Sequence, residues 1–201
     1  MTKTSNRAEP RKQPRQARSS ATVDAVVEAT ARIVESLGLD MLTTNRVAEM
    51  AGVSIGSLYQ YFPSKEALLV ALIRREREAL LQEISKTANS TTDLSSSIGG
   101  FIRAGLAHQF KRPSLSRTLE YVETTLPMCL EDEELARDIS CQLASILERH
   151  GVTDPKIAAT DMIALCRGII DAAALRGETD VNSLFSRLWR AVTGYLDTTV
   201  P

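Results

Sequence analysis

Aromatic residues and long apolar runs are scarce in this chain of 201 residues. Phe, Trp and Tyr together make up 4% of it, whereas Ala, Leu, Glu and Arg are frequent, a balance that favours helices over sheets. No apolar run approaches the roughly eighteen residues needed to cross a bilayer. The basic N-terminus is not followed by the apolar stretch of a secretory signal. We therefore expect a soluble, cytoplasmic protein with no membrane partner.

Cysteines and histidines are also few, and their spacing argues against a metal site. Cys129, Cys141 and Cys166 are widely separated and form no CxxC pair, which excludes a disulfide framework or a zinc site. His108 and His150, the only histidines, are far apart. Each cysteine is either a small buried apolar side chain or a redox-sensing thiol. We expect no metal and no cofactor.

Recognisable catalytic motifs are absent as well. The sequence shows no Ser-His-Asp set, phosphate-binding loop or paired-carboxylate motif. A small helical enzyme is therefore the weaker alternative, and we predict that the chain is not an enzyme.

Charge is distributed unevenly, although the formal net charge is only -1. Residues 1–20 carry six basic side chains and one acidic one, and residues 66–201 carry fifteen basic and nineteen acidic ones. A basic end on an acidic body suggests a polyanionic partner at that end, and a solvated tail without a partner is the alternative. Residues 1–20 have no apolar period, so we predict a flexible basic arm there.

Apolar residues recur at spacings of three and four along most of the remaining chain, which predicts an all-α fold of about nine helices. A first helix is expected from about Thr22 to Leu37, ending at Gly38, and a long fourth helix from Ser64 to about Ile84. The Ser- and Thr-rich stretch 85–97 predicts a hinge or loop. The further helices are expected at about 94–110, 114–125, 131–151, 155–176 and 181–198.

Residues 44–62 have the pattern of a helix-turn-helix, two short helices around a turn at Gly52. Leu58 and Phe62, four residues apart, are expected to pack inward against Val47 and Val53. In such motifs the second helix enters the major groove. The side chains expected to face outward for base contact are Ile55, Gly56, Ser57 and Gln60, and those expected to donate to phosphates are Tyr59, Tyr61 and Lys65.

The stretch GLDMLTTNRVAEMAGVSIGSLYQYFPSKEALL resembles the signature of TetR-family regulators. The matching features are the Gly of the first turn, the Thr-Thr entry, the V-A-x-x-A-G-V-S turn, the G-x-L-Y-x-Y-F helix and the S-K-E-x-L-L start of the fourth helix. The resemblance covers about Ala21 to Leu72. It implies a three-helix DNA-binding domain (21–85) joined by the long fourth helix to a ligand-binding and dimerisation domain (86–201).

The resemblance also implies roles for individual positions. Thr44 and Asn45 match the family's phosphate contacts at the start of the second helix. Ile55 departs from the polar residues often found at its position, so it either meets a thymine methyl group or packs. Arg15 and Arg18 in the basic arm are candidate minor-groove or phosphate contacts.

The last two expected helices carry an apolar stripe and several small residues, and they either pack within one chain or join two copies. The resemblance implies a homodimer that binds a near-palindromic operator in double-stranded DNA. The residues expected at the dimer interface are Ala164, Gly168, Ala172, Leu184, Phe185, Leu188, Val192 and Tyr195.

An effector pocket among the middle helices is the family's usual switch. We expect a small-molecule effector, apolar because the sequence offers no charged pocket, and hence a ligand-responsive repressor. A transcriptional activator and a non-specific architectural DNA-binding protein remain the alternatives. The candidate pocket residues, each of which is more often a plain core residue than a ligand contact, are Phe101, His108, Phe110, Tyr121, Met128, Met162 and Cys166.

Overall fold

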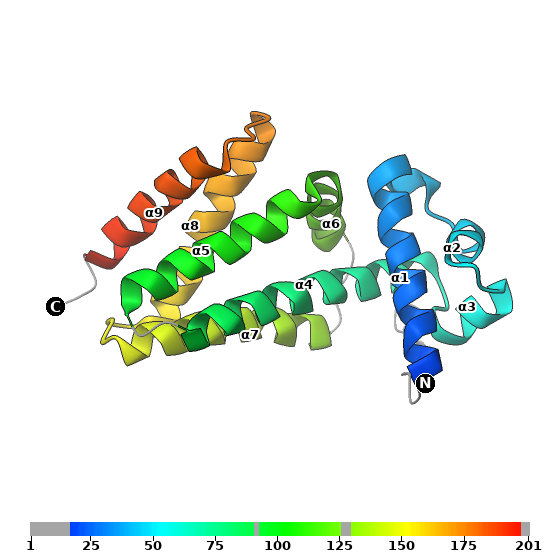
Figure 1. The fold of residues 1–201 in the computed structure, drawn as a ribbon, viewed down its shortest axis with the longest axis horizontal. Helices are drawn as coiled ribbons and strands as arrows, with labels where there is room; N and C mark the ends of the chain where they lie inside the picture. Colours follow the sequence, from blue (N-terminus) through cyan, green and yellow to red (C-terminus); the bar gives the residue numbers. More distant parts are fainter. Residues whose placement is uncertain (1–16, 91–92, 126–129, 198–201) are drawn as a thin grey trace, which may run out of the picture. The chain divides into compact units, whose positions relative to one another are not determined.

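The computed structural model describes residues 17–90, 93–125 and 130–197, and within these ranges the chain is helical and has no strand. The all-α prediction is confirmed for this part of the chain. In chain order the elements are α1 (Ala17–Leu37), the 3-10 turn η1 (Leu39–Met41), α2 (Thr44–Ala51), α3 (Ile55–Tyr61), α4 (Lys65–Ser90), α5 (Leu94–Lys111), α6 (Pro113–Thr125), α7 (Leu130–Arg149), α8 (Pro155–Leu175) and α9 (Val181–Asp197) (Figure 1). None of the helices in the described ranges is both long and apolar enough to span a membrane.

Local sequence sets the boundaries of the two short helices. Thr43 caps α2 by accepting a hydrogen bond from the backbone N–H of Arg46, and Ser54 caps α3 by accepting one from the N–H of Ser57. Between them Gly52 ends α2 in the left-handed conformation, with φ at +67°. A residue with a Cβ is strained in that conformation, so the glycine allows α3 to start so soon after α2.

The chain divides into two compact units. The first unit contains residues 1–76 and 112–129, and the second unit contains residues 77–111 and 130–201. The first unit therefore holds α1, α2, α3, the start of α4, and α6. The second unit holds the rest of α4 with α5, α7, α8 and α9. The sequence interpretation had placed α6 with the C-terminal domain.

The core of the first unit explains why α6 belongs to it. Ile33 of α1 and Leu58 of α3 are fully buried there, and Leu68 at the start of α4 joins them. Leu115 and Val122 of α6 are each 1% exposed and pack into the same cluster. Burying side chains of this size stabilises the unit by about 1.5–3 kcal/mol each, so α6 is an integral part of its fold.

The second unit has its own core, formed by facing sides of α5, α7, α8 and α9. Leu147, Met162 and Leu188, from three different helices, are 0% exposed. Helices α5 and α9 approach closely at Gly99, where a Cβ would lie 3.4 Å from the Trp189 ring. The two units thus bury separate sets of apolar side chains.

Two expected boundaries differ from the structure. Residues 85–90, expected within a hinge or loop, are helical, because α4 continues to Ser90. The Ser85 hydroxyl donates to the Leu81 carbonyl at 2.7 Å and accepts a hydrogen bond from Gln142 Nε2 at 2.7 Å, so this polar residue is satisfied inside a helix. Helix α1 also begins at Ala17, within the range expected to be an arm.

Candidate nucleic-acid interface

Helix α3 has exposed side chains on its outer face, and its opposite face packs into the core. Ile55 is 38% exposed, Gly56 and Gln60 are exposed, and Ser57 is half-buried. Leu58 on the opposite side is 0% exposed and belongs to the core of the first unit. Leu58 therefore lies on the packed side of this helix, and Ile55, Gly56 and Gln60 lie on its exposed side.

Small residues on the outer face of α3 allow another molecule to come close to the helix backbone. Gly56 has no side chain, and a Cβ placed there would meet only the Ser54 hydroxyl oxygen, at 3.9 Å. The hydroxyls of Ser54 and Ser57 lie 2.8 Å apart and bind one another. Small side chains of this kind let a helix backbone come close to the edges of bases in a groove.

The start of α2 is fastened to α3 by a side-chain hydrogen bond. The hydroxyls of Thr44 and Tyr59 lie 3.0 Å apart. Asn45 next to them is exposed, and Tyr59 is 42% exposed. The structure therefore brings these three expected phosphate contacts together at one edge of the helix pair.

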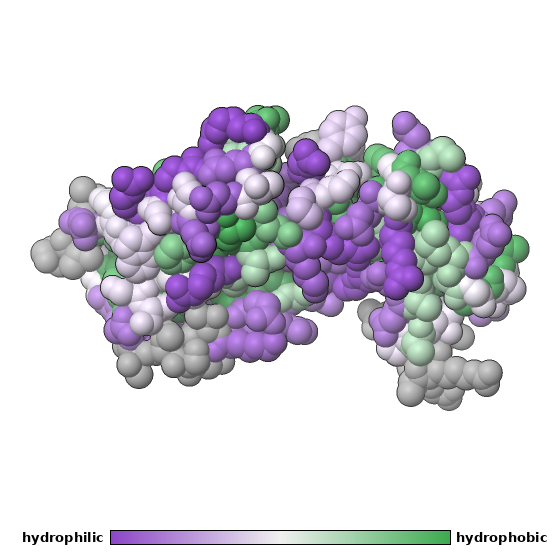
Figure 2. Space-filling view, turned by 45° about the horizontal axis from the view of Figure 1, so that its top comes forward, coloured by the Kyte–Doolittle hydropathy of each residue, from purple (hydrophilic) through white to green (hydrophobic). Residues whose placement is uncertain are grey.

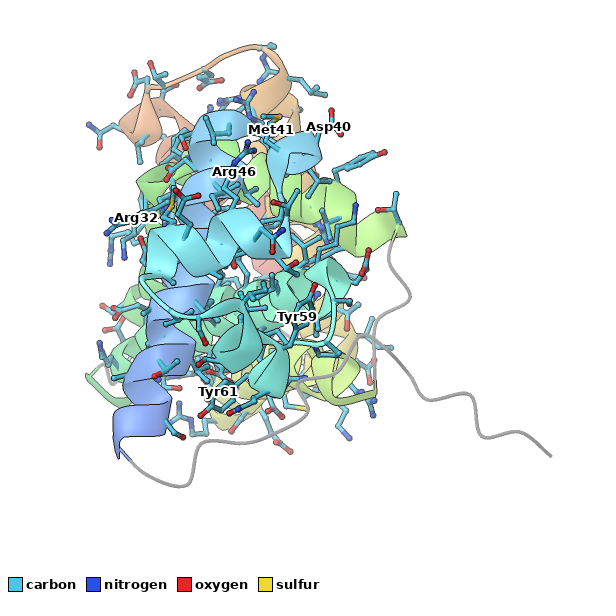
Figure 3. All side chains as sticks on the ribbon, turned by 90° about the vertical axis from the view of Figure 1, so that its right-hand side faces the viewer. Arg32, Asp40, Met41, Arg46, Tyr59 and Tyr61 are labelled. Atoms are coloured by element: carbon cyan, nitrogen blue, oxygen red, sulfur yellow. The ribbon has the colours of Figure 1, made fainter. Side chains whose placement is uncertain are left out.

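Tyr61 differs from Tyr59, because its ring packs into the core instead of lying on the outer face of α3. Its side chain is 9% exposed and lies in the core of the first unit, with its ring centroid 6.5 Å from that of Phe62 (Figure 3). Two residues along a helix correspond to a rotation of about 200°. Tyr59 and Tyr61 therefore point to nearly opposite sides of α3.

Lys65 stands at the start of α4, where it is exposed. The preceding Ser64 hydroxyl accepts a hydrogen bond from the N–H of Ala67 at 3.2 Å and caps the helix. A cation beside a helix N-terminus is well suited to a phosphate. Arg15 lies outside the described residues, and of Arg18 the structure describes only the backbone, in the first turn of α1.

Arg46 has a positioning role that the sequence analysis missed. Its Nη1 donates to the Met41 carbonyl oxygen at 2.7 Å, so the side chain ties α2 to the η1 turn (Figure 3). This hydrogen bond could not be predicted from the sequence, because its acceptor is a backbone carbonyl in a turn that has no side-chain pattern. This contact fixes how α2 enters the motif.

An ion-pair network links α1, α4 and Arg112, the residue that precedes α6. The Glu28 carboxylate accepts from Arg32 at 3.0 Å, Arg75 at 3.1 Å and Arg112 at 3.4 Å. Arg112 also binds Glu35 at 2.6 Å, a hydrogen bond that raises the pKa of Arg112. Burial acts to raise the pKa of Glu28, but the hydrogen bond from Arg32 and the charges of Arg112 and Arg75 outweigh it and leave that pKa lowered.

The candidate pocket residues are distributed between the two units. Phe101, Met162 and Cys166 lie in one buried cluster of the second unit, and burial raises the pKa of the Cys166 thiol to about 11. That pKa favours a buried apolar side chain over a redox-sensing thiol. His108 and Phe110 are half-buried on α5. Tyr121 is 63% exposed on α6 of the first unit, and Met128 lies outside the described residues.

Expected interface residues also separate into two groups. Leu184, Leu188 and Val192 are 0% exposed within the single chain, so they have no surface to offer a second copy, and that expectation is corrected. Their positions on α9 face the core of the second unit. The members that do reach the surface are Ala164 and Gly168, which are exposed, and Ala172, Phe185 and Tyr195, which are half-buried.

Between α8 and α9 runs an open groove of about 580 Å³. The Tyr195 hydroxyl donates to Asp161 Oδ2 at 2.7 Å across it, and this hydrogen bond raises the pKa of Tyr195. The groove is lined by Asp161, Ala164, Leu165, Gly168, Ile169 and Tyr195. No group of three or more His, Cys, Asp or Glu side chains in the described ranges is arranged to hold a metal ion.

Comparison with known proteins agrees with the helix-turn-helix assignment. Residues 26–72 match the family described as "Bacterial regulatory proteins, tetR family", and residues 93–196 match "Tetracyclin repressor-like, C-terminal domain". The nucleoid occlusion factor SlmA of Haemophilus influenzae (strain PittGG) is 28% identical over 145 residues. That match covers 65% of this chain and 65% of the relative, so just under two thirds of the relative's length is matched.

Solved structures show the same fold at low sequence identity. A TetR transcription regulator from Haloarcula marismortui ATCC 43049 has a TM-score of 0.75 at 19% identity, covering 90% of this chain and 100% of that one. A TetR-family regulator from Streptomyces coelicolor has a TM-score of 0.73 at 19% identity, covering 91% of this chain and 99% of that one.

Proposed function

Because the chain belongs to the TetR family of DNA-binding transcriptional regulators, we propose that it is a ligand-responsive repressor that binds a near-palindromic operator as a homodimer. The observation that carries the proposal is the outer face of α3. There Ile55, Gly56 and Gln60 are exposed, while Leu58 anchors the helix in the core. Such a helix presents side chains to base edges and holds them rigidly.

Base readout is assigned to two of these side chains. The Gln60 amide has one donor and one acceptor group and can bind adenine N6 and N7 together. Ile55, with 38% of its surface exposed, is positioned to contact a thymine methyl group. Its exposure favours this contact over the alternative of packing within the chain.

We assign the positioning of the protein on the DNA to a second set of residues. Thr44, Asn45, Tyr59 and Lys65 are surface groups on α2, α3 and the start of α4 that can donate hydrogen bonds to phosphate oxygens. These contacts orient the protein and add affinity that depends on salt, but they do not discriminate between sequences.

Homodimer formation is assigned to α8 and α9. TetR-family proteins typically dimerise, and a two-fold dimer would place two copies of α3 on successive major grooves, about 34–36 Å apart. Small exposed residues on α8, such as Ala164 and Gly168, allow helices of two chains to approach closely. A near-palindromic operator follows from that symmetry.

The effector is assigned to the interior of the second unit. Phe101, Met162 and Cys166 belong to one buried apolar cluster. We assign an apolar ligand to this cluster. The ligand can reduce DNA affinity only if it binds another state of the protein more tightly than the DNA-binding state.

Selection of bound duplexes from a random DNA library, repeated at two salt concentrations, tests the proposal. A near-palindromic site enriched over random DNA is the expected result. Binding that follows salt alone, with no enriched sequence, would identify a non-specific architectural protein instead. A reporter gene placed beside the selected site then separates repression, which lowers expression when the protein is supplied, from activation, which raises it.

A second candidate is favoured by the similarity to SlmA, whose name describes a nucleoid occlusion factor. A protein with such a role acts on the nucleoid and need not regulate a gene. Chromosome-wide occupancy distinguishes the two functions. A repressor is expected at a few sites that overlap promoters, whereas the alternative predicts many sites without that relation to promoters.

A further inference from the structure

Basic side chains of the first unit differ in whether an acidic side chain of the same chain neutralises them. Figure 2 shows one face of the molecule, where hydrophilic and hydrophobic side chains both reach the surface. Arg32, Arg75 and Arg112 all bind Glu28. Arg46 on α2, in contrast, forms no ion pair with any acidic residue of the described chain. Its charge is therefore available to a partner.

The guanidinium group of Arg46 is held in place although it has no acidic partner among the described residues. Its Nη1 donates to the Met41 carbonyl oxygen at 2.7 Å (Figure 3). The next residue, Leu42, is 2% exposed and belongs to the core of the first unit, so a buried side chain fixes the acceptor. A long side chain loses rotamer freedom when a ligand orders it, and here part of that loss has already occurred on folding.

Most hydrogen-bond donors of this guanidinium remain unused. The group carries five N–H donors in one plane. In the described part of the chain the contact with Met41 is the one hydrogen bond that the Arg46 side chain makes. One edge of the group can therefore hold the carbonyl while another edge binds an oxyanion, and the fork of N–H groups matches the oxygens of a phosphate.

Arg46 also stands beside residues that the proposed function places against DNA. It belongs to the first turn of α2, together with Thr44 and Asn45. Its backbone N–H donates to the Thr43 hydroxyl oxygen at 3.3 Å, so the main chain of this turn is fixed as well as the side chain. The Thr44 hydroxyl lies 3.0 Å from that of Tyr59. An unneutralised and ordered cation thus adjoins two side chains to which phosphates are already assigned.

We propose that Arg46 binds a phosphate of the DNA through the guanidinium group that the Met41 carbonyl orients. The inference rests on the DNA binding of the proposed function and adds one phosphate contact per chain. Arg46 then has two roles, since the same side chain ties α2 to the η1 turn and neutralises the DNA backbone. A residue that only positioned α2 would contribute to affinity but not to the release of counterions from the DNA.

The salt dependence of DNA binding by the full-length chain separates these roles. Arg46→Gln is expected to lower the slope of log affinity against log salt by about one for each bound chain, and to weaken binding by about tenfold or more. Arg46→Lys keeps the charge and is expected to keep the slope. Arg117→Gln removes an exposed cation from α6 of the same unit and should leave the slope unchanged.

Two results would overturn the contact. In the first, Arg46→Gln weakens binding at the wild-type slope, so that Arg46 acts only on the fold. In the second, Arg117→Gln lowers the slope by the same amount, so that the slope reports net charge alone. The slopes are measured on the selected site and on a random duplex. A wild type without an enriched site contradicts the sequence-specific repressor, whereas the slope on the random duplex still tests Arg46.

Chemical modification of the wild-type protein decides the matter if Arg46→Gln fails to fold, as judged by circular dichroism. Phenylglyoxal reacts with guanidinium groups, and mass spectrometry gives the rate at each arginine. DNA is expected to slow the modification of Arg46 several-fold and to leave the rate at Arg117 unchanged. The same rate at Arg46 with and without DNA would overturn the phosphate contact.

Discussion

The two units present their candidate functional residues in opposite ways. In the first unit the proposed base contacts Ile55 and Gln60 are exposed, above the buried Leu58. In the second unit the candidate ligand contacts, such as Met162, are buried in the same cluster as structural residues such as Leu188. Surface positions that touch DNA need particular residue types, whereas a core accepts many apolar combinations. This explains why a motif is recognisable in one unit and not in the other.

Leu58→Ala and Leu188→Ala should show the largest difference between the functions of the two units. Both side chains are 0% exposed, so each truncation is expected to lower the free energy of unfolding by about 2–5 kcal/mol. Leu58→Ala should remove DNA binding and keep dimerisation, and Leu188→Ala should weaken dimerisation. Urea unfolding, a DNA-binding titration and sedimentation measure the three effects. Equal losses of both activities from both variants would show that the units do not act separately.

Gln60→Ala should change sequence preference without changing stability. Loss of a bidentate contact to adenine is expected to cost about 1–3 kcal/mol at one position of each half-site and to relax base preference there. Binding to a set of duplexes varied at one base pair at a time measures this. If the preference stays as sharp as in the wild type, Gln60 does not read a base.

Tyr59→Phe and Tyr61→Phe form a matched pair on one helix. Removing the exposed Tyr59 hydroxyl should weaken binding to all duplexes alike, by about 0.5–1.5 kcal/mol, because a phosphate contact and the hydrogen bond to Thr44 are lost. Tyr61→Phe should leave binding unchanged, because that side chain is in the core. Equal losses from the two variants would contradict the separation of these tyrosines.

Glu28→Gln should produce the smallest effect, and that effect should depend on pH. The pKa of Glu28 is lowered on folding, so the folded state binds this proton less tightly than the unfolded state does. The stabilisation by the Glu28 carboxylate is present above the pKa of the unfolded state, near 4.5. It is lost as the pH falls through the lower pKa of the folded state. The partial exposure of the side chain limits it to about 0.2–1 kcal/mol.

Unfolding of the wild type and of Glu28→Gln at pH 7 and near pH 3 measures this contribution. The difference between the two proteins should be largest at pH 7 and should shrink in acid. Glu83→Gln is the control, since Glu83 lies in an exposed pair with Lys86 in the second unit. A constant difference at both pH values would mean that the Glu28 charge does not stabilise the first unit.

The parts of the fold that local sequence determines were predictable. Gly38 and Gly52 both have positive φ and end the helices that the pattern predicted. The inward direction of Leu58 and Phe62 followed from their spacing, and both are buried.

The remaining features depend on contacts between distant segments. Ser85 is helical where its residue type favours a loop, because its hydroxyl donates to the Leu81 carbonyl and accepts from the Gln142 side chain. The burial of Leu184 and Val192 within the chain was missed because one apolar stripe serves equally well for an internal core and for an interface. The burial of the Tyr61 ring was missed because its motif position was considered without the rotation of the helix.

The most direct test of the central claim is the ratio of two affinities at the same salt concentration. One is for the site enriched from the random library, and the other is for a scrambled duplex of the same length and composition. A dimer whose α3 helices read base edges should prefer its site by about a thousandfold or more. Equal affinities for both duplexes would contradict sequence-specific recognition by α3.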